Sequence, residues 1–153
     1  MRSENRKRAR LRLDERLDSL KPETQFLPPP KGWIRAIRDA LGMSGPQLAS
    51  RLEVRPQTVE TIEKSEAADT IQLKTLRRAA EALDCTLVYA LVPKTSLANA
   101  VNSRARKIAI RHLDRVAHTM RLEAQATNNT DKEARIEAYI RDVLKERALW
   151  DES

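Results

Sequence analysis

The sequence predicts a mainly α-helical protein. Apolar residues recur at helical spacing along most of the 153-residue chain. Hydrophobic residues make up 41% of it and aromatic residues only 3%, so we expect a core of Leu, Ile, Val and Ala. Charged residues account for 33% and there are three glycines, a composition that favours helices over sheet.

The chain is basic, with a formal net charge of +7. Such a charge attracts polyanions, most commonly phosphate backbones, although it can also serve solubility alone. Cys85 is the single cysteine, which excludes a disulfide framework, and we expect neither a metal nor a cofactor. No apolar run approaches the ~20 residues that span a bilayer, and the N-terminus lacks a signal-peptide core. We therefore expect a cytoplasmic protein without a membrane partner.

Residues 1–30 are predicted to form a basic N-terminal helix followed by a Pro-rich linker. Ala9, Leu13, Leu17 and Leu20 lie at helical spacing. The basic residues around this stripe are Arg2, Arg6, Lys7, Arg8, Arg10, Arg12 and Arg16. The helix could lie along DNA, pack on a partner or be merely solvated. Four prolines in KPETQFLPPPKG, residues 21–32, then prevent a continuous helix.

Residues 31–93 are predicted to form a domain of short helices. The first apolar stripe starts at Trp33 and ends at Gly42, and Ser44 caps the next helix. A third helix starts at Pro56, and a fourth apolar run ends at Leu83. Pro46 and Pro56 lie in first turns, where a missing N–H interrupts no helical hydrogen bond.

Residues 85–92 predict one short β-strand. The stretch CTLVYALVP is apolar, aromatic and β-branched, and it is bounded by Asp84 and Pro93. A single strand leaves its backbone groups unpaired, so we expect antiparallel pairing with a second copy and hence a homodimer. A short helical turn or an unpaired extended segment is the alternative.

Residues 94–153 are predicted to form a helical hairpin. The first helix, over about 97–126, has one apolar face. This face contains Ala105, Ile108, Ala109, Leu113, Val116, Met120 and Ala124. TNNT interrupts the pattern, and Thr130 with Glu133 has the spacing of a capping box that opens the second helix.

The two helices on either side of Glu53 have the spacing of a helix-turn-helix. The residues expected to form their shared core are Leu48, Ala49, Leu52, Val54, Val59 and Ile62. The outward face of the second helix is then polar, with Gln57, Thr58, Thr61 and Lys64, and Arg55 precedes it. These side chains suit base edges and phosphates, although a purely structural helix pair is the alternative.

This stretch resembles the Cro/phage-repressor type of helix-turn-helix domain. The matching residues are Gln47-Leu48-Ala49, Leu52-Glu53-Val54, TVETIE at residues 58–63 and LRRAAEALDC at residues 76–85. The resemblance implies a five-helix domain. Glu53 departs from it, because the family favours glycine at the turn, and Arg55-Pro56 stands where the family often has a capping Ser or Thr.

The helix that starts at Pro56 is expected to lie in the major groove. Arg suits guanine and Gln suits adenine, so Arg55 and Gln57 are assigned to base edges. Thr61 would meet a thymine methyl or face solvent. The residues expected at phosphates are Ser44, Gln47, Thr58 and Lys64. Because one module reads few bases, we expect a dimer on a palindromic operator.

A longer stretch, from PPPKGWIRAIRDALGMS to RVAHTMRLEAQ, resembles the mobile mystery protein A family. That resemblance implies an antitoxin encoded beside a Fic-domain toxin, an AMP-transferase. TMRLEA matches the Thr-x-x-x-Glu of Fic inhibitors at Thr119 and Glu123 and departs from it at Ala124. The Glu123 carboxylate would occupy the toxin's arginine for the ATP γ-phosphate.

We do not expect an enzyme, because His112 and His118 lie on different helical sides and neither has an obvious nucleophile. The favoured function is an antitoxin that represses its own operon and inhibits a Fic toxin through Glu123. One alternative is a stand-alone repressor whose C-terminal helices only dimerise. Another is a non-specific nucleic-acid protein that uses its basic arm and charge alone.

Overall fold

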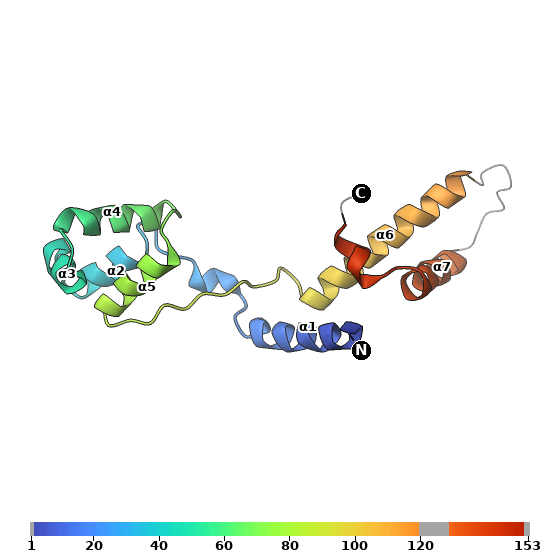
Figure 1. The fold of residues 1–153 in the computed structure, drawn as a ribbon, viewed down its shortest axis with the longest axis horizontal. Helices are drawn as coiled ribbons and strands as arrows, with labels where there is room; N and C mark the ends of the chain where they lie inside the picture. The colour runs from blue at the N-terminus through green and yellow to red at the C-terminus, as the bar shows by residue number, and fades with distance from the viewer. Residues whose placement is uncertain (1, 120–128, 152–153) are drawn as a thin grey trace. The chain divides into compact units, whose positions relative to one another are not determined.

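The computed structural model describes residues 2–119 and 129–151, which form α-helices, 3-10 helices and connecting segments (Figure 1). The chain divides into two compact units. The central unit is Pro22–Leu91, and the terminal unit combines Met1–Lys21 with Val92–Ser153. The mainly α-helical prediction is confirmed. None of the described helices is long and apolar enough to cross a membrane.

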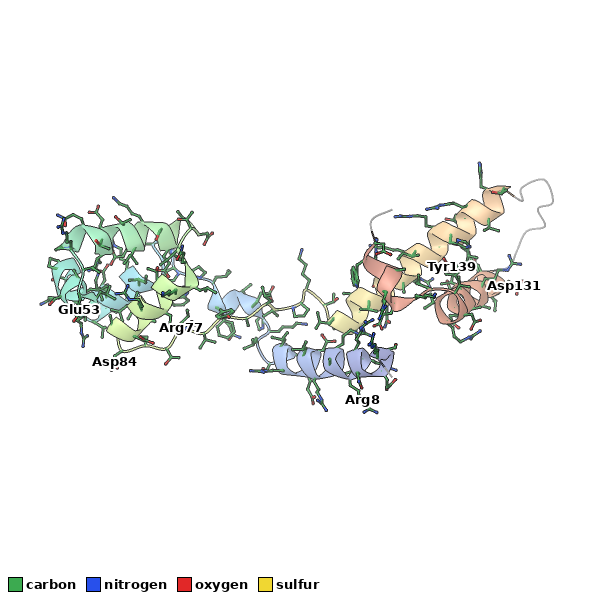
Figure 2. The ribbon with its side chains drawn as sticks, viewed as in Figure 1. Arg8, Glu53, Arg77, Asp84, Asp131 and Tyr139 are labelled. Atoms are coloured by element: carbon green, nitrogen blue, oxygen red, sulfur yellow. The ribbon has the colours of Figure 1, made fainter. Side chains whose placement is uncertain are left out.

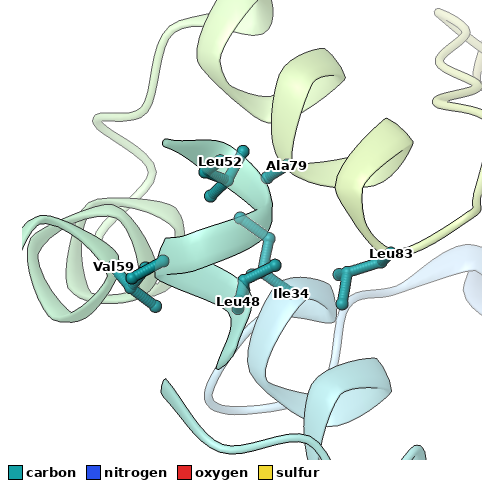
Figure 3. Close-up of a cluster of buried hydrophobic side chains, with 7 residues drawn as sticks. Ile34, Leu48, Leu52, Val59, Ala79 and Leu83 are labelled. Atoms are coloured by element: carbon teal, nitrogen blue, oxygen red, sulfur yellow. The ribbon is translucent and has the colours of Figure 1, made fainter. Parts of the chain in front are cut away.

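The central unit contains four α-helices around one small core. These are α2 (Trp33–Ala40), α3 (Gly45–Leu52), α4 (Pro56–Ala67) and α5 (Leu73–Ala82), preceded by the 3-10 helix η1 (Glu23–Phe26). The resemblance implied five helices, so the described unit has one α-helix fewer. Its buried core, drawn in Figure 3, consists of Ile34, Leu48, Ala49, Leu52, Val59, Ala79 and Leu83.

The predicted β-strand at residues 85–92 is wrong. This segment is extended but forms no ladder, and no other strand occurs in the part of the chain described here. β-branched and aromatic residues favour a strand only when a neighbouring strand can pair with it. The side chains of Val88, Tyr89 and Leu91 are instead 81%, 64% and 88% exposed.

A buried carboxylate from α4 holds the start of α2. Glu66 accepts hydrogen bonds from the backbone N–H groups of Trp33 (2.8 Å) and Ile34 (2.9 Å). The residue before the helix, Gly32, supplies no side-chain cap and has a φ of 84°. A Cβ on Gly32 would lie 2.7 Å from Oε2 of Glu66, so only glycine leaves room for this carboxylate.

A second carboxylate of α4 binds the other end of α2. Glu63 is paired with Arg38, whose Nε and Nη2 donate to the two carboxylate oxygens over 2.6 and 3.2 Å. Arg38 also donates to the carbonyl of Met43 over 2.9 Å. The hydrogen bond to Glu63 is the main reason that the pKa of Arg38 lies above its ordinary value. Two polar links from α4 therefore position α2 beside the apolar core.

The terminal unit is built around the long helix α6 (Leu97–Thr119). Three other helices pack against it, namely α1 (Arg2–Asp18), α7 (Asn129–Asp142) and the 3-10 helix η3 (Glu146–Trp150). The buried apolar residues of the terminal unit are Ala105 and Ala109 of α6, Ile136 of α7 and Leu149 of η3. The two alanines allow close approach of the neighbouring elements. α6 and α7 pack together as the expected hairpin requires.

Polar contacts dock α1 on this unit. Asp14 accepts from the backbone N–H groups of Leu97 (2.6 Å) and Ala98 (3.0 Å) and so caps α6. Arg10 donates to Glu146 and holds the pKa of that carboxyl below its ordinary value. That link is therefore intact at neutral pH and is lost as the pH falls through the lowered pKa. The apolar stripe expected for this helix is not buried, and Leu13 is 47% exposed.

The capping box expected at Thr130 and Glu133 is not formed. Thr130 lies inside α7, because the helix already includes Asn129. The carboxylate of Glu133 binds Arg106 of α6 over 2.5 and 2.8 Å. This hydrogen bond, more than the charge of Arg106, lowers the pKa of Glu133. A salt bridge between helices thus replaces the local cap.

We expect Glu66→Gln to destabilise the central unit, because the new amide can accept at one oxygen but presents a donor to the second backbone N–H. The expected loss is about 1–3 kcal/mol in the free energy of unfolding. Urea unfolding followed by tryptophan fluorescence in a Trp150→Phe background measures it, since Trp33 is then the only tryptophan. Glu60→Gln on the exposed side of α4 is the control, and equal midpoints for the two variants would contradict the capping role.

Candidate nucleic-acid interface

The turn between α3 and α4 brings the two helices together at a small residue. Ala49 is 1% exposed and packs with Leu48 and Val59. Glu53, labelled in Figure 2, has φ 57° and ψ 40°, and Val54 N–H closes α3 by donating to the carbonyl of Ala49 over 3.0 Å. The left-handed turn conformation is therefore adopted with glutamate where the resembling family favours glycine.

The start of α3 carries a complete capping box. Ser44 Oγ accepts from the backbone N–H of Gln47 (3.3 Å), and Gln47 Oε1 accepts from the backbone N–H of Ser44 (2.7 Å). Both side chains are exposed. After this exchange the Ser44 hydroxyl and the Gln47 amide can still donate hydrogen bonds outward. The two residues assigned to phosphates thus retain the donors that a phosphate needs.

The exposed and buried faces of α4 are opposite each other. Val59, Glu63 and Glu66 are buried at spacings of four and three residues. Gln57, Thr61 and Lys64 repeat this spacing on the other side and are exposed. Arg55 and Thr58, which adjoin this ridge, are exposed as well. All the side chains that the sequence assigned to α4 or its N-cap therefore reach solvent.

Local hydrogen bonds on this ridge reduce the donors that Thr61 and Lys64 can present to a ligand. The Thr61 hydroxyl donates to the carbonyl of Gln57 (3.0 Å), which leaves its methyl group and an oxygen lone pair for a ligand. Lys64 Nζ lies 2.8 Å from Oε1 of Glu60. That hydrogen bond, more than the charge itself, lowers the pKa of Glu60. To bind a phosphate, the Lys64 ammonium group must either keep its hydrogen bond to Glu60 and bind both groups, or break that hydrogen bond.

The central unit carries no net charge. Residues 22–91 contain nine Lys and Arg side chains and nine Asp and Glu side chains. Glu63 and Glu66 are buried on the inner side of α4, so the outward face is less acidic than the count implies. The face of α4 is suited to reading polar groups, while the excess positive charge of the protein lies elsewhere.

The residues that support this surface were not predicted from the sequence. Glu63 and Glu66 lie on the same helical side as Val59, and two charged residues on an apolar face are a signal that buried partners exist. A further support is Arg78 of α5, whose Nη2 is 3.4 Å from the carbonyl of Leu52 at the end of α3. These residues position α3 and α4 and do not belong to the exposed ridge.

The terminal unit holds the second predicted site only in part. Thr119 is exposed, and its hydroxyl donates to the carbonyl of Arg115 over 2.9 Å. Glu123 and Ala124 lie outside the described residues. His112 stacks on Tyr139 of α7, with the ring centroids 4.5 Å apart. Across residues 2–119 and 129–151, no group of three or more His, Cys, Asp or Glu side chains could hold a metal ion.

Glu53→Gly is expected to stabilise the central unit by about 0.5–1 kcal/mol, because glycine adopts a positive φ without the Cβ repulsion that glutamate meets. Ser50→Gly, at an exposed helical position of α3, is the matched control and should destabilise it. The melting temperatures of the two variants and of the unchanged protein, measured by thermal unfolding, test these opposite changes in stability. A lower melting temperature for Glu53→Gly would show that the glutamate side chain itself stabilises the turn.

Comparison with known proteins agrees with this geometry. Residues 34–89 match the Helix-turn-helix family. No curated protein and no solved structure matches the chain. The matched region covers α2 to α5 and thus the whole core of the central unit, which confirms the resemblance to repressor-type domains over these residues. Residues 34–89 therefore form a DNA-binding helix-turn-helix domain.

Proposed function

We propose that this protein is a sequence-specific transcriptional repressor that inserts α4 into the major groove of its operator. The observation that carries the proposal is the polar ridge of Gln57, Thr61 and Lys64, which lies opposite the buried residues Val59, Glu63 and Glu66. A helix with this division can present side chains to base edges without disturbing the core beneath it.

In this arrangement Arg55 and Gln57 read bases. Arg55 precedes the first turn of α4, makes no capping hydrogen bond with its side chain and is exposed. Its guanidinium fork suits O6 and N7 of guanine, and the Gln57 amide suits N6 and N7 of adenine. Thr61 presents its methyl group, because its hydroxyl donates to the helix backbone, and a thymine methyl is the complementary contact.

Four further side chains would bind the DNA backbone and set the register of α4. Ser44 and Gln47 stand at the amino end of α3, where the helix dipole favours a phosphate. Thr58 and Lys64 lie on α4 itself. Such contacts fix the orientation of the domain but carry no sequence information.

We also propose that the repressor acts as a homodimer on a palindrome, because one helix reads few base pairs. Its apolar contact would include Val88, Tyr89 and Leu91, which are large and at least 64% exposed in a stretch of four residues. Exposed apolar side chains this close together favour an interface. The proposal requires packing of side chains and no β-strand.

The double variant Arg55→Ala/Gln57→Ala is expected to lose discrimination between operator and scrambled DNA while its unfolding curve stays unchanged. Each lost bidentate contact removes about 1–3 kcal/mol of discrimination, or roughly 5- to 150-fold in relative affinity. The operator is first selected from random duplexes. Footprinting then shows which bases are protected, and titration against operator and scrambled DNA measures the discrimination. For a dimer, the footprint should show two half-sites about one helical turn apart.

Arg35→Ala is the matched control, since Arg35 is an exposed cation of α2 outside the polar ridge. This variant should keep the full preference for the operator. If the double variant protects the same bases with the same preference as the unchanged protein, α4 does not read the groove.

A second proposed function is inhibition of a Fic-type AMP-transferase by the terminal unit, for which the sequence resemblance and the exposure of α6 are the support. Thr119 is exposed on the last described turn of α6, and Val116, three residues earlier, is 42% exposed. A partner could contact this end of the helix. Glu123 would then pair with the partner's arginine for the ATP γ-phosphate.

Inhibition is tested by co-purifying the chain with the Fic protein encoded beside it and measuring AMP transfer from labelled ATP. Glu123→Gly should raise transfer by at least tenfold, since it frees the arginine for ATP. Glu137→Gly, an exposed glutamate of α7, controls for the loss of a charge and for glycine in a helix. Equal transfer with Glu123→Gly and the unchanged chain would refute inhibition through Glu123 and favour a stand-alone repressor whose C-terminal helices only dimerise.

A further inference from the structure

The whole positive excess of the protein belongs to the terminal unit. Residues 1–21 and 92–153 contain 20 Lys and Arg residues against 13 Asp and Glu residues, which accounts for the full +7 of the chain. The helix-turn-helix domain lies in the other unit, which is electrically neutral. Attraction to a phosphate backbone must therefore come mainly from the terminal unit.

Several cations of α1 form ion pairs within the terminal unit. Arg10 and Arg6 both approach Glu146, the second over 3.5 Å, and Arg8 lies 3.9 Å from Glu4. The helix also contains Asp14, Glu15 and Asp18. These pairs lower the potential that α1 can present to a ligand.

A basic stripe on α6, formed by Lys107, Arg111 and Arg115, is the stronger candidate. Its residues recur every four positions and so share one helical side. They line a shallow depression together with Ile110, Asp114 and His118, and Asp114 is the only acidic residue of α6. Lys107 and Arg115 are exposed.

The stripe is directed away from the packed side of the helix. Ala105 and Ala109 are buried on the core side, and at about 3.6 residues per turn position 107 falls about half a turn from them, position 111 somewhat less and position 115 little more than a quarter of a turn. Two neighbouring cations make contacts within the unit. Arg104 donates to the carbonyl of Leu149 (2.7 Å), and Arg106 binds Glu133.

We propose that this basic stripe binds the phosphate backbone of duplex DNA without reading its sequence. A line of cations at helical spacing, with one carboxylate beside it, complements a continuous row of phosphates. The inference rests on the proposed function in one respect, since the helix-turn-helix domain supplies sequence preference but no net positive charge. The stripe would then supply affinity that is independent of sequence.

The test uses the full-length double variant Lys107→Gln/Arg115→Gln and a duplex of random sequence, at salt concentrations from 0.05 to about 0.3 M. The slope of log K against log salt should become less steep by about two, which corresponds to roughly 30-fold weaker binding at 0.15 M salt. Because no operator is involved, this result does not depend on whether α4 reads bases.

The charge-matched control is Lys132→Gln/Arg135→Gln, which removes two exposed cations from α7. It should leave the slope nearly unchanged, and far-UV circular dichroism should show that both variants are folded. An unchanged slope in the stripe variant overturns the proposal and leaves an acidic protein surface as the ligand of α6. Equal losses in the two variants also overturn it, because the attraction would then be a property of net charge alone.

Discussion

The central unit depends on one buried carboxylate. Glu66 satisfies two backbone N–H groups at the start of α2, where Gly32 offers no side chain and leaves the space that the carboxylate fills. Because Glu66 and Glu63 both belong to α4, the helix that presents the polar ridge also fixes α2 through the ion pair with Arg38. The outward face of α4 can vary with little effect on these contacts, since they all lie on its inner side. The exposed ridge and the buried contacts thus lie on opposite sides of one helix of twelve residues.

The terminal unit uses the same physical device. Its long helix α6 receives the Asp14 carboxylate at its first N–H groups, just as α2 receives Glu66. In both cases an acceptor from a distant helix binds at an end where unpaired donors and the helix dipole favour a negative charge. At α2 it stands in for a missing local cap, whereas at α6 it adds to the Ser96 hydroxyl, which accepts from the backbone N–H of Asn99 over 2.9 Å. These contacts specify which helix packs where, because an apolar stripe alone tolerates sliding while a carboxylate bound to two N–H groups does not. The few aromatic residues and small cores of both units make such polar contacts more important.

Net charge is divided unevenly between the two units. The helix-turn-helix domain is formally neutral, and on its ridge Lys64 is paired with Glu60. The basic excess lies on the other unit, where α6 carries three cations on one solvent-facing side. Under the roles proposed for α4 and α6, sequence preference and overall affinity can change independently, because different side chains would determine them.

The positions of the helices, the turn at Glu53 and the exposed residues of α4 followed from the sequence, because periodicity, first-turn prolines and the Ser44 cap act over a few neighbouring residues. The sequence also pointed to Leu48, Ala49, Leu52 and Val59 as core. Only the tertiary structure decided the contacts of Glu66 and Asp14, whose partners are 33 and 83 positions away. It also decided that residues 85–92 form no strand. A strand requires a neighbour and a distant cap requires a particular packing, and neither requirement is written in local sequence.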